Sequence, residues 1–440
     1  MKLKLLFALL IVTISNAQTQ IGQDITLNGN SVNAVALSEN GNVIALSNTV
    51  TKIYTKVSGN WTQVGQDIQQ SGYRILLSND GSIVAITNGF TMVRVYKNIN
   101  NTWTQVGQDI QEYGHDIALS GDGSTLAIAP MGGQFKIYKN ISSNWTSIEN
   151  INILGGVFSV CLSEDGNTIA AAPHPGTTID IFKYANNKWT QSGTINANPN
   201  DNSTGFRMDM SSDGNTIAIT TMAVHPQNTG SINVYRYINN TWTQIGNPIT
   251  SQVQNERYAM NVAISGTGNV VVVGSNEGGN SWNGRVDVFE YLQGNWVKKG
   301  EIIDKNGNNI DWTIALSRDG NNLAIRSNGS VGPKPAGNTG NNQGKGPSAG
   351  VRVYDIQAIL SSDTFVLENF NIYPNPTTDI LNIELKENLT LEKVLIYNTS
   401  GQLVKETSDK TINVNGFAKG IYNIQVLTNH GKATKKVIVK

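Results

Sequence analysis

The sequence is poor in cysteine, histidine and charged residues, and each scarcity excludes something. Its one cysteine, Cys161, cannot form an internal disulfide, so the fold must rest on its packed core. With only four histidines, we find no cluster with metal-ligand spacing and no nucleophile motif. Charged residues make up 15%, with 32 basic and 32 acidic, which leaves no basic field for nucleic acid. We predict no metal, no cofactor and no nucleic-acid partner.

Long apolar runs are also missing. No stretch approaches the ~18 consecutive apolar residues of a membrane-spanning helix, so we expect no membrane span. The N-terminus has a basic start, an apolar run from Leu5 to Ile14 and a small-residue exit at Ala17. These are the parts of a signal peptide, predicted over residues 1–17 with cleavage near Ala17. The alternative is a buried N-terminal helix.

What the sequence does have is a repeat. A Leu-Ser-x-Asp-Gly-like motif occurs seven times, at Leu37–Gly41, Leu77–Gly81, Leu119–Gly123, Leu162–Gly166, Met210–Gly214, Ile264–Gly268 and Leu316–Gly320. Each copy is followed by an apolar strand and by a third alternating strand. In six copies a fourth strand begins at a tryptophan. Period-2 alternation with Gly and Asn turns predicts four-stranded antiparallel units, whose size is that of a propeller blade. A turn repeated so often is interpreted as structural, with glycine supplying positive φ and aspartate capping.

The seventh copy stops at Tyr354 and lacks the tryptophan-led strand. The segment Thr19–Ile25 nearly repeats Thr62–Ile68 and Thr104–Ile110. We therefore predict that Gln20–Ile25 supplies the missing strand and closes the ring, since pairing there hides both sheet edges. The expected fold is all-β, with a seven-bladed β-propeller over residues 18–356.

The repeat pattern, with Ala-Ile after the Asp-Gly turn and a later Val-Tyr and Trp, resembles FG-GAP-like propellers of bacterial surface proteins. That family's calcium-binding Asp-x-Asp-x-Asp-Gly loops are absent here, so the resemblance carries no metal site over to this chain.

The C-terminal part has a different composition. After a predicted linker over residues 357–369, residues 370–440 contain Tyr373-Pro-Asn-Pro376 and short alternating strands, which predict a small immunoglobulin-like β-sandwich. Tyr-Pro-Asn-Pro, Gly420-Ile-Tyr422 and a basic terminus closely resemble the C-terminal sorting domain of the type IX secretion system of Bacteroidetes. The resemblance implies export to the cell surface, the secretion machinery as partner, and a domain that can be exchanged for a surface anchor. The alternative is an ordinary immunoglobulin-like accessory domain.

Candidate site residues come from aligning the repeats. If the leucine strand is innermost, the residues three positions before the leucine lie near one mouth of the channel. Four of them could bind a polar ligand such as a glycan or a carboxylate: Arg74, Asp116, Arg207 and Asn261. The alternative is salt bridging between blades, for example Arg74 with Asp116.

The residues four positions before the leucine are predicted to pack between blades: Asn33, Tyr73, His115, Phe158, Phe206, Met260 and Trp312. His115 is then a packing histidine rather than a ligand.

Later repeats carry insertions, predicted to gather on one face: Asn196–Thr204, Met222–Gly230, Ser275–Arg285 and Ser327–Gly350. His225 and Trp282 in them are candidate ligand contacts. The last insertion, rich in Gly, Asn, Ser and Pro, can also be interpreted as a flexible segment.

No complete catalytic grouping emerges, which favours a secreted or surface-attached, non-catalytic binding or adhesion protein for a glycan or a surface protein. An extracellular glycan-active hydrolase or lyase is the alternative. It requires carboxylates, or a Tyr or His together with Arg, converging at one site. A structural surface-layer component is a third possibility.

Overall fold

The computed structural model divides into two compact units. Thr19–Ile356 form the repeat unit and Gln357–Lys440 belong to the C-terminal unit. The structure describes residues 19–27, 32–130, 134–153, 156–173, 178–196, 204–221, 230–251, 258–275, 285–303, 308–330, 350–361, 366, 369–386, 389–398, 402–428 and 431–440. The predicted signal peptide lies outside these residues.

The repeat unit is all-β, and its described strands form seven antiparallel sheets. The first three sheets in chain order consist of β2 (Ala34–Leu37), β3 (Val43–Ser47), β4 (Thr51–Val57) and β5 (Asn60–Gln63); β6 (Arg74–Leu77), β7 (Ile83–Thr87), β8 (Val93–Ile99) and β9 (Thr102–Gln105); and β10 (Asp116–Leu119), β11 (Thr125–Ala129), β12 (Phe135–Ile141) and β13 (Asn144–Ile151).

The other four sheets follow the same plan. They consist of β14 (Val157–Leu162), β15 (Thr168–Pro173), β16 (Thr178–Ala185) and β17 (Lys188–Asn196); β18 (Thr204–Met210), β19 (Thr216–Thr221), β20 (Ser231–Ile238), β21 (Thr241–Gln244) and β22 (Ile249–Thr250); β23 (Asn261–Ile264), β24 (Val270–Ser275), β25 (Arg285–Leu292) and β26 (Asn295–Ile303); and β27 (Asn308–Leu316), β28 (Asn322–Ser330), β29 (Gly350–Asp355) and β1 (Thr19–Thr26).

The turns between strands have the chemistry that the repeat predicts. The Ser78 hydroxyl donates to the Asp80 carboxylate at 2.6 Å, and the Ser82 N–H donates to the same oxygen at 2.9 Å. Gly81 has a φ of 71°, which favours glycine. Asn100 and Asn101, between the third and fourth strands, both have positive φ, as a type I′ hairpin requires. The structural role predicted for the Asp-Gly turn is confirmed.

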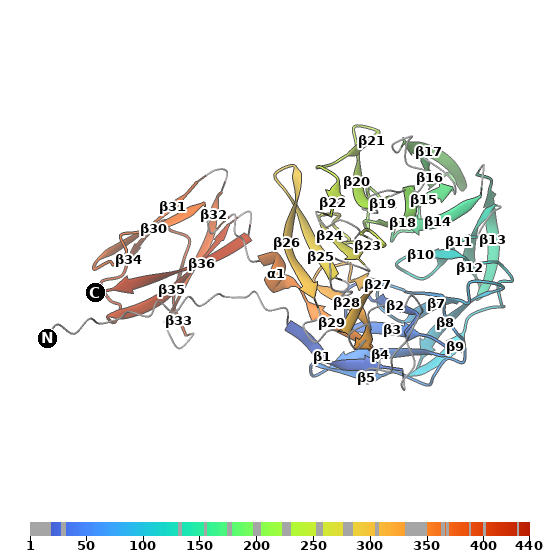
Figure 1. Cartoon of the computed structure of the whole chain (residues 1–440), viewed down its shortest axis with the longest axis horizontal. Coiled ribbons are helices and arrows are strands. Elements are labelled where there is room, and N and C mark those ends of the chain that lie inside the picture. Colours follow the sequence, from blue (N-terminus) through green and yellow to red (C-terminus); the bar gives the residue numbers. More distant parts are fainter. Residues whose placement is uncertain are drawn as a thin grey trace, which may run out of the picture. The chain divides into compact units, whose positions relative to one another are not determined.

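The sheets stand around a common centre (Figure 1). The innermost strands β2, β6, β10, β14, β18, β23 and β27 contact one another in that order, and β27 contacts β2. A ring of backbone hydrogen bonds of 2.7–3.1 Å follows the same path. Its N–H donors run through Glu39, Asn79, Gly121, Glu164, Ser212 and Gly266 to the Arg318 carbonyl, and the Asp319 N–H returns to the Glu39 carbonyl.

Strand β1 completes the last sheet. It pairs antiparallel with β29, with Gln20 opposite Tyr354 and Ile25 opposite Val351. Asp24 forms an ion pair with Arg352 at 3.1 Å across this junction. The predicted pairing of the N-terminal segment with the strand that contains Tyr354 is confirmed.

A second set of contacts joins neighbouring sheets through the Thr-Gln-x-Gly-Gln-Asp segments. The Gln66 side-chain amide donates to the Trp103 carbonyl at 2.8 Å and accepts from the Trp103 N–H at 3.1 Å. The Trp103 indole N–H donates to the Val64 carbonyl at 2.8 Å. Gly65, at a φ of 69°, sits so close that a Cβ would come within 2.9 Å of Trp103 and of the Asn101 carbonyl. Each such segment therefore holds the tryptophan of the next sheet.

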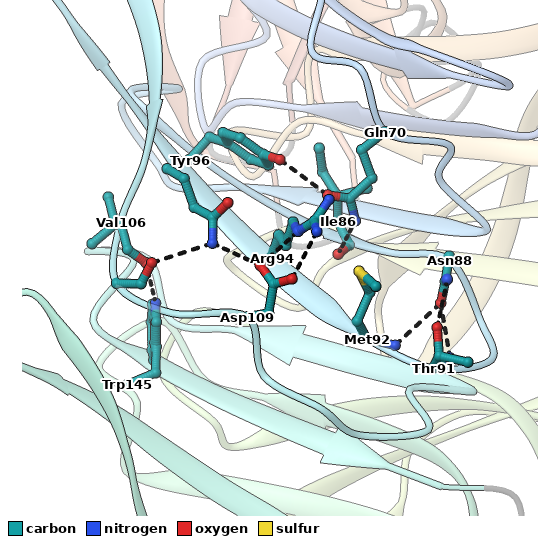
Figure 2. A network of polar contacts seen from close by, with 12 residues as sticks. Gln70, Ile86, Asn88, Thr91, Met92, Arg94, Tyr96, Val106, Asp109 and Trp145 are labelled. Carbon is teal, nitrogen blue, oxygen red and sulfur yellow. Dashed lines mark hydrogen bonds and ion pairs between the residues drawn. The ribbon is translucent and has the colours of Figure 1, made fainter.

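The aspartate of the segment is held within its own sheet. Arg94 on β8 binds both carboxylate oxygens of Asp109 at 2.7 Å (Figure 2). Gln105 donates to the same carboxylate at 2.9 Å. The guanidinium lowers the pKa of Asp109 to about 2. Lys52 with Asp67 repeats the ion pair at 3.3 Å.

The C-terminal unit contains a short helix, α1 (Gln357–Ser361), and two antiparallel sheets. One has the order β30 (Phe370–Tyr373), β31 (Ile380–Leu385) and β34 (Thr411–Asn413); the other has β33 (Leu403–Thr407), β32 (Leu391–Asn398), β35 (Gly420–Thr428) and β36 (Gly431–Val439). Both contribute to one buried core, which includes Phe370, Val394 and Ile424. Val366, from the predicted linker, is buried in the same core.

The Tyr373-Pro-Asn-Pro376 segment borders the last strand. The Asn375 side chain donates to the Lys436 carbonyl at 2.9 Å and accepts from the Ile438 N–H at 3.0 Å. It thus satisfies backbone groups at the open edge of β36. In the part of the chain that the structure describes, helices long and apolar enough to cross a bilayer are absent.

Candidate functional site

The centre of the repeat unit contains a cavity of about 210 Å³. It is lined by all seven innermost strands, from Val35 on β2 to Leu316 on β27. Because strand side chains alternate, the residues one and three positions before each repeat leucine face this channel. Most are small, such as Ala36, Ala118 and Ala263, and the larger polar residues gather at the two ends.

Four of the six predicted site residues line this cavity: Arg74, Asp116, Arg207 and Asn261. We call this end the arginine mouth. Arg74 Nη2 lies 2.6 Å from Asp116 Oδ1, so the ion pair offered as the alternative to ligand binding is present. The other two residues, His225 and Trp282, lie outside the described residues, as do most of the predicted insertions.

Asp116 is 2% exposed, and both its oxygens are occupied. Besides its ion pair with Arg74, Asp116 accepts hydrogen bonds from the Ser159 hydroxyl at 2.9 Å and the Val160 N–H at 3.1 Å, both in the neighbouring sheet. It also accepts a hydrogen bond from the Ile117 N–H. A carboxylate held by this many donors is a structural anchor rather than a base available to a ligand.

Arg207 is placed differently. Its guanidinium lies 4.8 Å from the Phe206 ring centroid and donates to the Phe206 carbonyl at 3.2 Å. Burial, together with the nearby charge of Arg74, lowers the pKa of Arg207 to about 10, against the opposing effects of Asp116 and Tyr73. Arg207 therefore remains a cation at neutral pH.

An arc of aromatic rings borders the arginine mouth. Ring centroids are 5.9 Å apart for Tyr73 and His115, 4.5 Å for His115 and Phe158, and 5.4 Å for Phe158 and Phe206. Beyond Tyr73, Phe90 contacts Tyr113 edge-on at 6.3 Å. A Cβ at Gly89 would lie 2.9 Å from the Tyr73 ring, so the two parts adjoin. We call these six residues the aromatic track.

The track corrects one sequence interpretation. Asn33 and Tyr73 were expected to pack between blades, but both are exposed, Tyr73 to 41%. The physical reason is that this position precedes the first residue of the inner strand, so its burial depends on a neighbouring side chain rather than on the alternation. The Phe158 ring covers His115 at 4.5 Å, whereas Tyr73 remains exposed. His115 is 8% exposed and agrees with the packing interpretation.

A polar network that the sequence interpretation missed lines the opposite end of the channel. Arg318 lies 3.5 Å from Glu164 Oε1 and 3.2 Å from Asp209 Oδ1, and donates to the Met210 carbonyl at 2.9 Å. Asn79 donates to Glu164 Oε2 at 2.9 Å. Although burial alone would lower the pKa of Arg318, Asp209 and Glu164 raise it above its usual value. The sequence signal was an arginine at the variable position of Leu-Ser-x-Asp-Gly.

Other chemistry near the channel is limited. Cys161 is buried in the channel wall, and burial together with Asp209 and Asp116 raises the pKa of its thiol. The thiol therefore stays protonated and is a poor nucleophile. Among the described residues no group of three His, Cys, Asp or Glu side chains is placed to bind a metal ion.

Comparison with known proteins identifies the C-terminal unit. Residues 371–440 match the secretion system C-terminal sorting domain. This domain indicates secretion and attachment at the cell surface or outer membrane, with handling by the type IX secretion system.

Similarity to whole proteins is lower. The chain is 36% identical over 85 residues to the ulvan lyase NLR42 of Nonlabens ulvanivorans, which covers 18% of this chain and only 16% of that protein. Among solved structures, a Kuenenia stuttgartiensis hydrazine synthase chain has a TM-score of 0.47 at 14% identity, covering 69% of this chain and 94% of that one. A Lactobacillus plantarum protein has a TM-score of 0.48 at 15% identity, covering 63% of this chain and 85% of that one. A putative 6-phosphogluconolactonase of Bacteroides fragilis NCTC 9343 scores 0.47 at 14% (62% and 84%).

Proposed function

We propose that this protein is a non-catalytic binding protein of the cell surface, built on a closed seven-bladed propeller of FG-GAP-like type. In this proposal residues 1–17 are a signal peptide and residues 370–440 an immunoglobulin-like sorting domain. The ring of inter-sheet hydrogen bonds and the pairing of β1 with β29 support a closed propeller.

The ligand we propose is a glycan bound at the arginine mouth. The observation that supports it is the adjacency of the aromatic track to Arg74 and Arg207. Exposed aromatic rings can stack on the apolar faces of sugar rings, and guanidinium groups donate several hydrogen bonds in a fixed geometry. A rigid mouth presents both kinds of group without an ordering cost at binding.

A second candidate is a glycan lyase. The required grouping of a Tyr or His with Arg is present in Tyr73, His115 and Arg207, and the similarity to part of an ulvan lyase favours it. In such an elimination a base takes the proton next to a sugar carboxylate, a C=C bond forms, and the glycosidic C–O bond breaks with protonation of the leaving oxygen. Burial lowers the pKa of His115, which keeps it neutral and able to accept a proton. The low exposure of His115 disfavours its role as the base in such an elimination.

The test is a glycan array with the full mature chain, followed by assays of the bound polysaccharide for new reducing ends and for the ultraviolet absorbance of an unsaturated product. We expect saturable binding without turnover. Turnover that His115→Gln abolishes while binding persists would establish the lyase instead. A chain that binds no glycan would rule out both.

A further inference from the structure

Among the described residues, the charges at the arginine mouth do not balance. Arg74 and Arg207 contribute two cations, and Asp116 contributes one anion that is already paired with Arg74 at 2.6 Å. Asp209, deeper in the channel, accepts from Arg318 at 3.2 Å and from the Ile264 N–H at 2.9 Å. In the part of the chain that the structure describes, no carboxylate lies within ion-pair distance of Arg207.

The uncompensated cation is partly removed from water, which is costly for a guanidinium without an anion. Burial and Arg74 lower the pKa of Arg207, yet it stays charged at neutral pH. The Nε of Arg74 is buried and also has no hydrogen-bond partner among the described residues. What Arg207 lacks among the described residues is a paired anion, and an anionic group bound beside it would supply that charge.

Next to these donors the aromatic track leads outward. Phe90 is 67% exposed and Tyr73 is 41% exposed, whereas His115, whose ring neighbours that of Tyr73, is buried. Phe90 contacts Tyr113, and Gly89 adjoins the Tyr73 ring, so these exposed side chains form one patch. Contiguous apolar patches, unlike single exposed side chains, mark ligand-binding surfaces. The cavity itself, at about 210 Å³, is smaller than a typical drug-sized pocket and suits one small group rather than a whole oligomer.

We infer that the ligand is an acidic saccharide chain, with a carboxylate or sulfate of one sugar bound by Arg207 and Arg74 and adjacent sugar rings stacked on Tyr73 and Phe90. This inference rests on the proposed glycan-binding function and specifies its substrate class. The acidic group of the saccharide supplies the negative charge that Asp116, already paired with Arg74, does not provide to Arg207. The aromatic track supplies contact area for the neutral sugar rings.

The experiment compares matched polymers by calorimetry with the full mature chain. Polygalacturonate is compared with its methyl ester, and dextran sulfate with dextran, so that each pair differs in the acid group. We expect one acidic polymer to bind at least about tenfold more tightly than its neutral partner. The polymer pair that shows this difference in affinity identifies the acid group as a carboxylate or a sulfate.

Variants assign the effect to the site. Arg207→Gln should abolish the preference for the acidic polymer, whereas Lys97→Gln, which removes an exposed cation from β8, should retain it. Phe90→Ala should weaken binding severalfold, whereas Ile99→Ala, 50% exposed at a hairpin of the same sheet, should not. Melting curves check that each variant is folded.

Three results would overturn the inference. Equal affinity within both polymer pairs, or a preference that survives in Arg207→Gln, would remove the acid site and leave glycan binding intact. Failure to bind these polymers or any glycan of the array would remove the proposed function as well.

Discussion

His115 illustrates how one residue's neighbours decide its chemistry. Its ring lies between Tyr73 and Phe158, and its Nε2 is buried with no hydrogen-bond partner among the described residues. Burial lowers its pKa; Asp116 opposes this, and Arg207 and Arg74 add to it. The folded protein therefore favours the neutral form of the His115 imidazole.

This makes a prediction about pH. Because the unfolded chain has the ordinary histidine pKa of 6.5, it binds the proton before the folded chain does as pH falls. The stabilising effect of neutral His115 is complete above pH 6.5 and is lost progressively between that value and the lowered folded pKa. His115→Phe keeps the ring and removes the titration, so its melting temperature should fall less between pH 7 and pH 5 than that of the wild type. Parallel curves would show that His115 does not contribute.

At the scale of elements, the Thr-Gln-x-Gly-Gln-Asp segment turns a sequence repeat into contacts between sheets. The pattern could be seen in the sequence, but its partners could not, because Gln66 and Trp103 belong to different repeats. The repeats that precede those of Trp189 and Trp242 lack the complete Thr-Gln-x-Gly-Gln-Asp segment. The indole N–H groups of Trp189 and Trp242 have no hydrogen-bond partner within the described ranges.

We predict that Gln66→Ala destabilises the fold by about 1–3 kcal/mol, because it removes two partly buried hydrogen bonds to the backbone of Trp103. Gln63→Ala is the matched control. Among the described residues, that exposed side chain bonds within its own segment, to Gly65 and Asp67, and its loss should cost less. Urea unfolding measures both changes. Equal effects of the two variants would contradict an inter-sheet role for Gln66.

At the scale of the whole repeat unit, one N-terminal strand completes the last sheet. β1 covers the edge of β29, and the Asp24–Arg352 ion pair fixes it there. An uncovered edge presents unpaired backbone groups and promotes association.

A chain that starts after Leu27 should therefore melt at a lower temperature and associate at concentrations where a chain starting at Thr19 stays monomeric. Calorimetry and size-exclusion chromatography make the comparison. If the two chains melt together and elute alike, β1 does not stabilise the repeat unit.

The sequence by itself determined the features that depend on local periodicity: the alternating strands, the Asp-Gly turns, the repeat length, the pairing of Gln20–Ile25 with the strand that contains Tyr354, and the C-terminal sorting domain. Only the tertiary structure decided which of the equivalent repeat positions are exposed and which are covered or paired. Tyr73 and His115 occupy the same place in neighbouring repeats, yet one is exposed and the other is covered by Phe158. Likewise Asp116 is saturated by the adjacent sheet, whereas Arg207 has no counter-ion among the described residues. Equivalent positions differ because their environments come from side chains of other repeats, which the order of residues along the chain does not place.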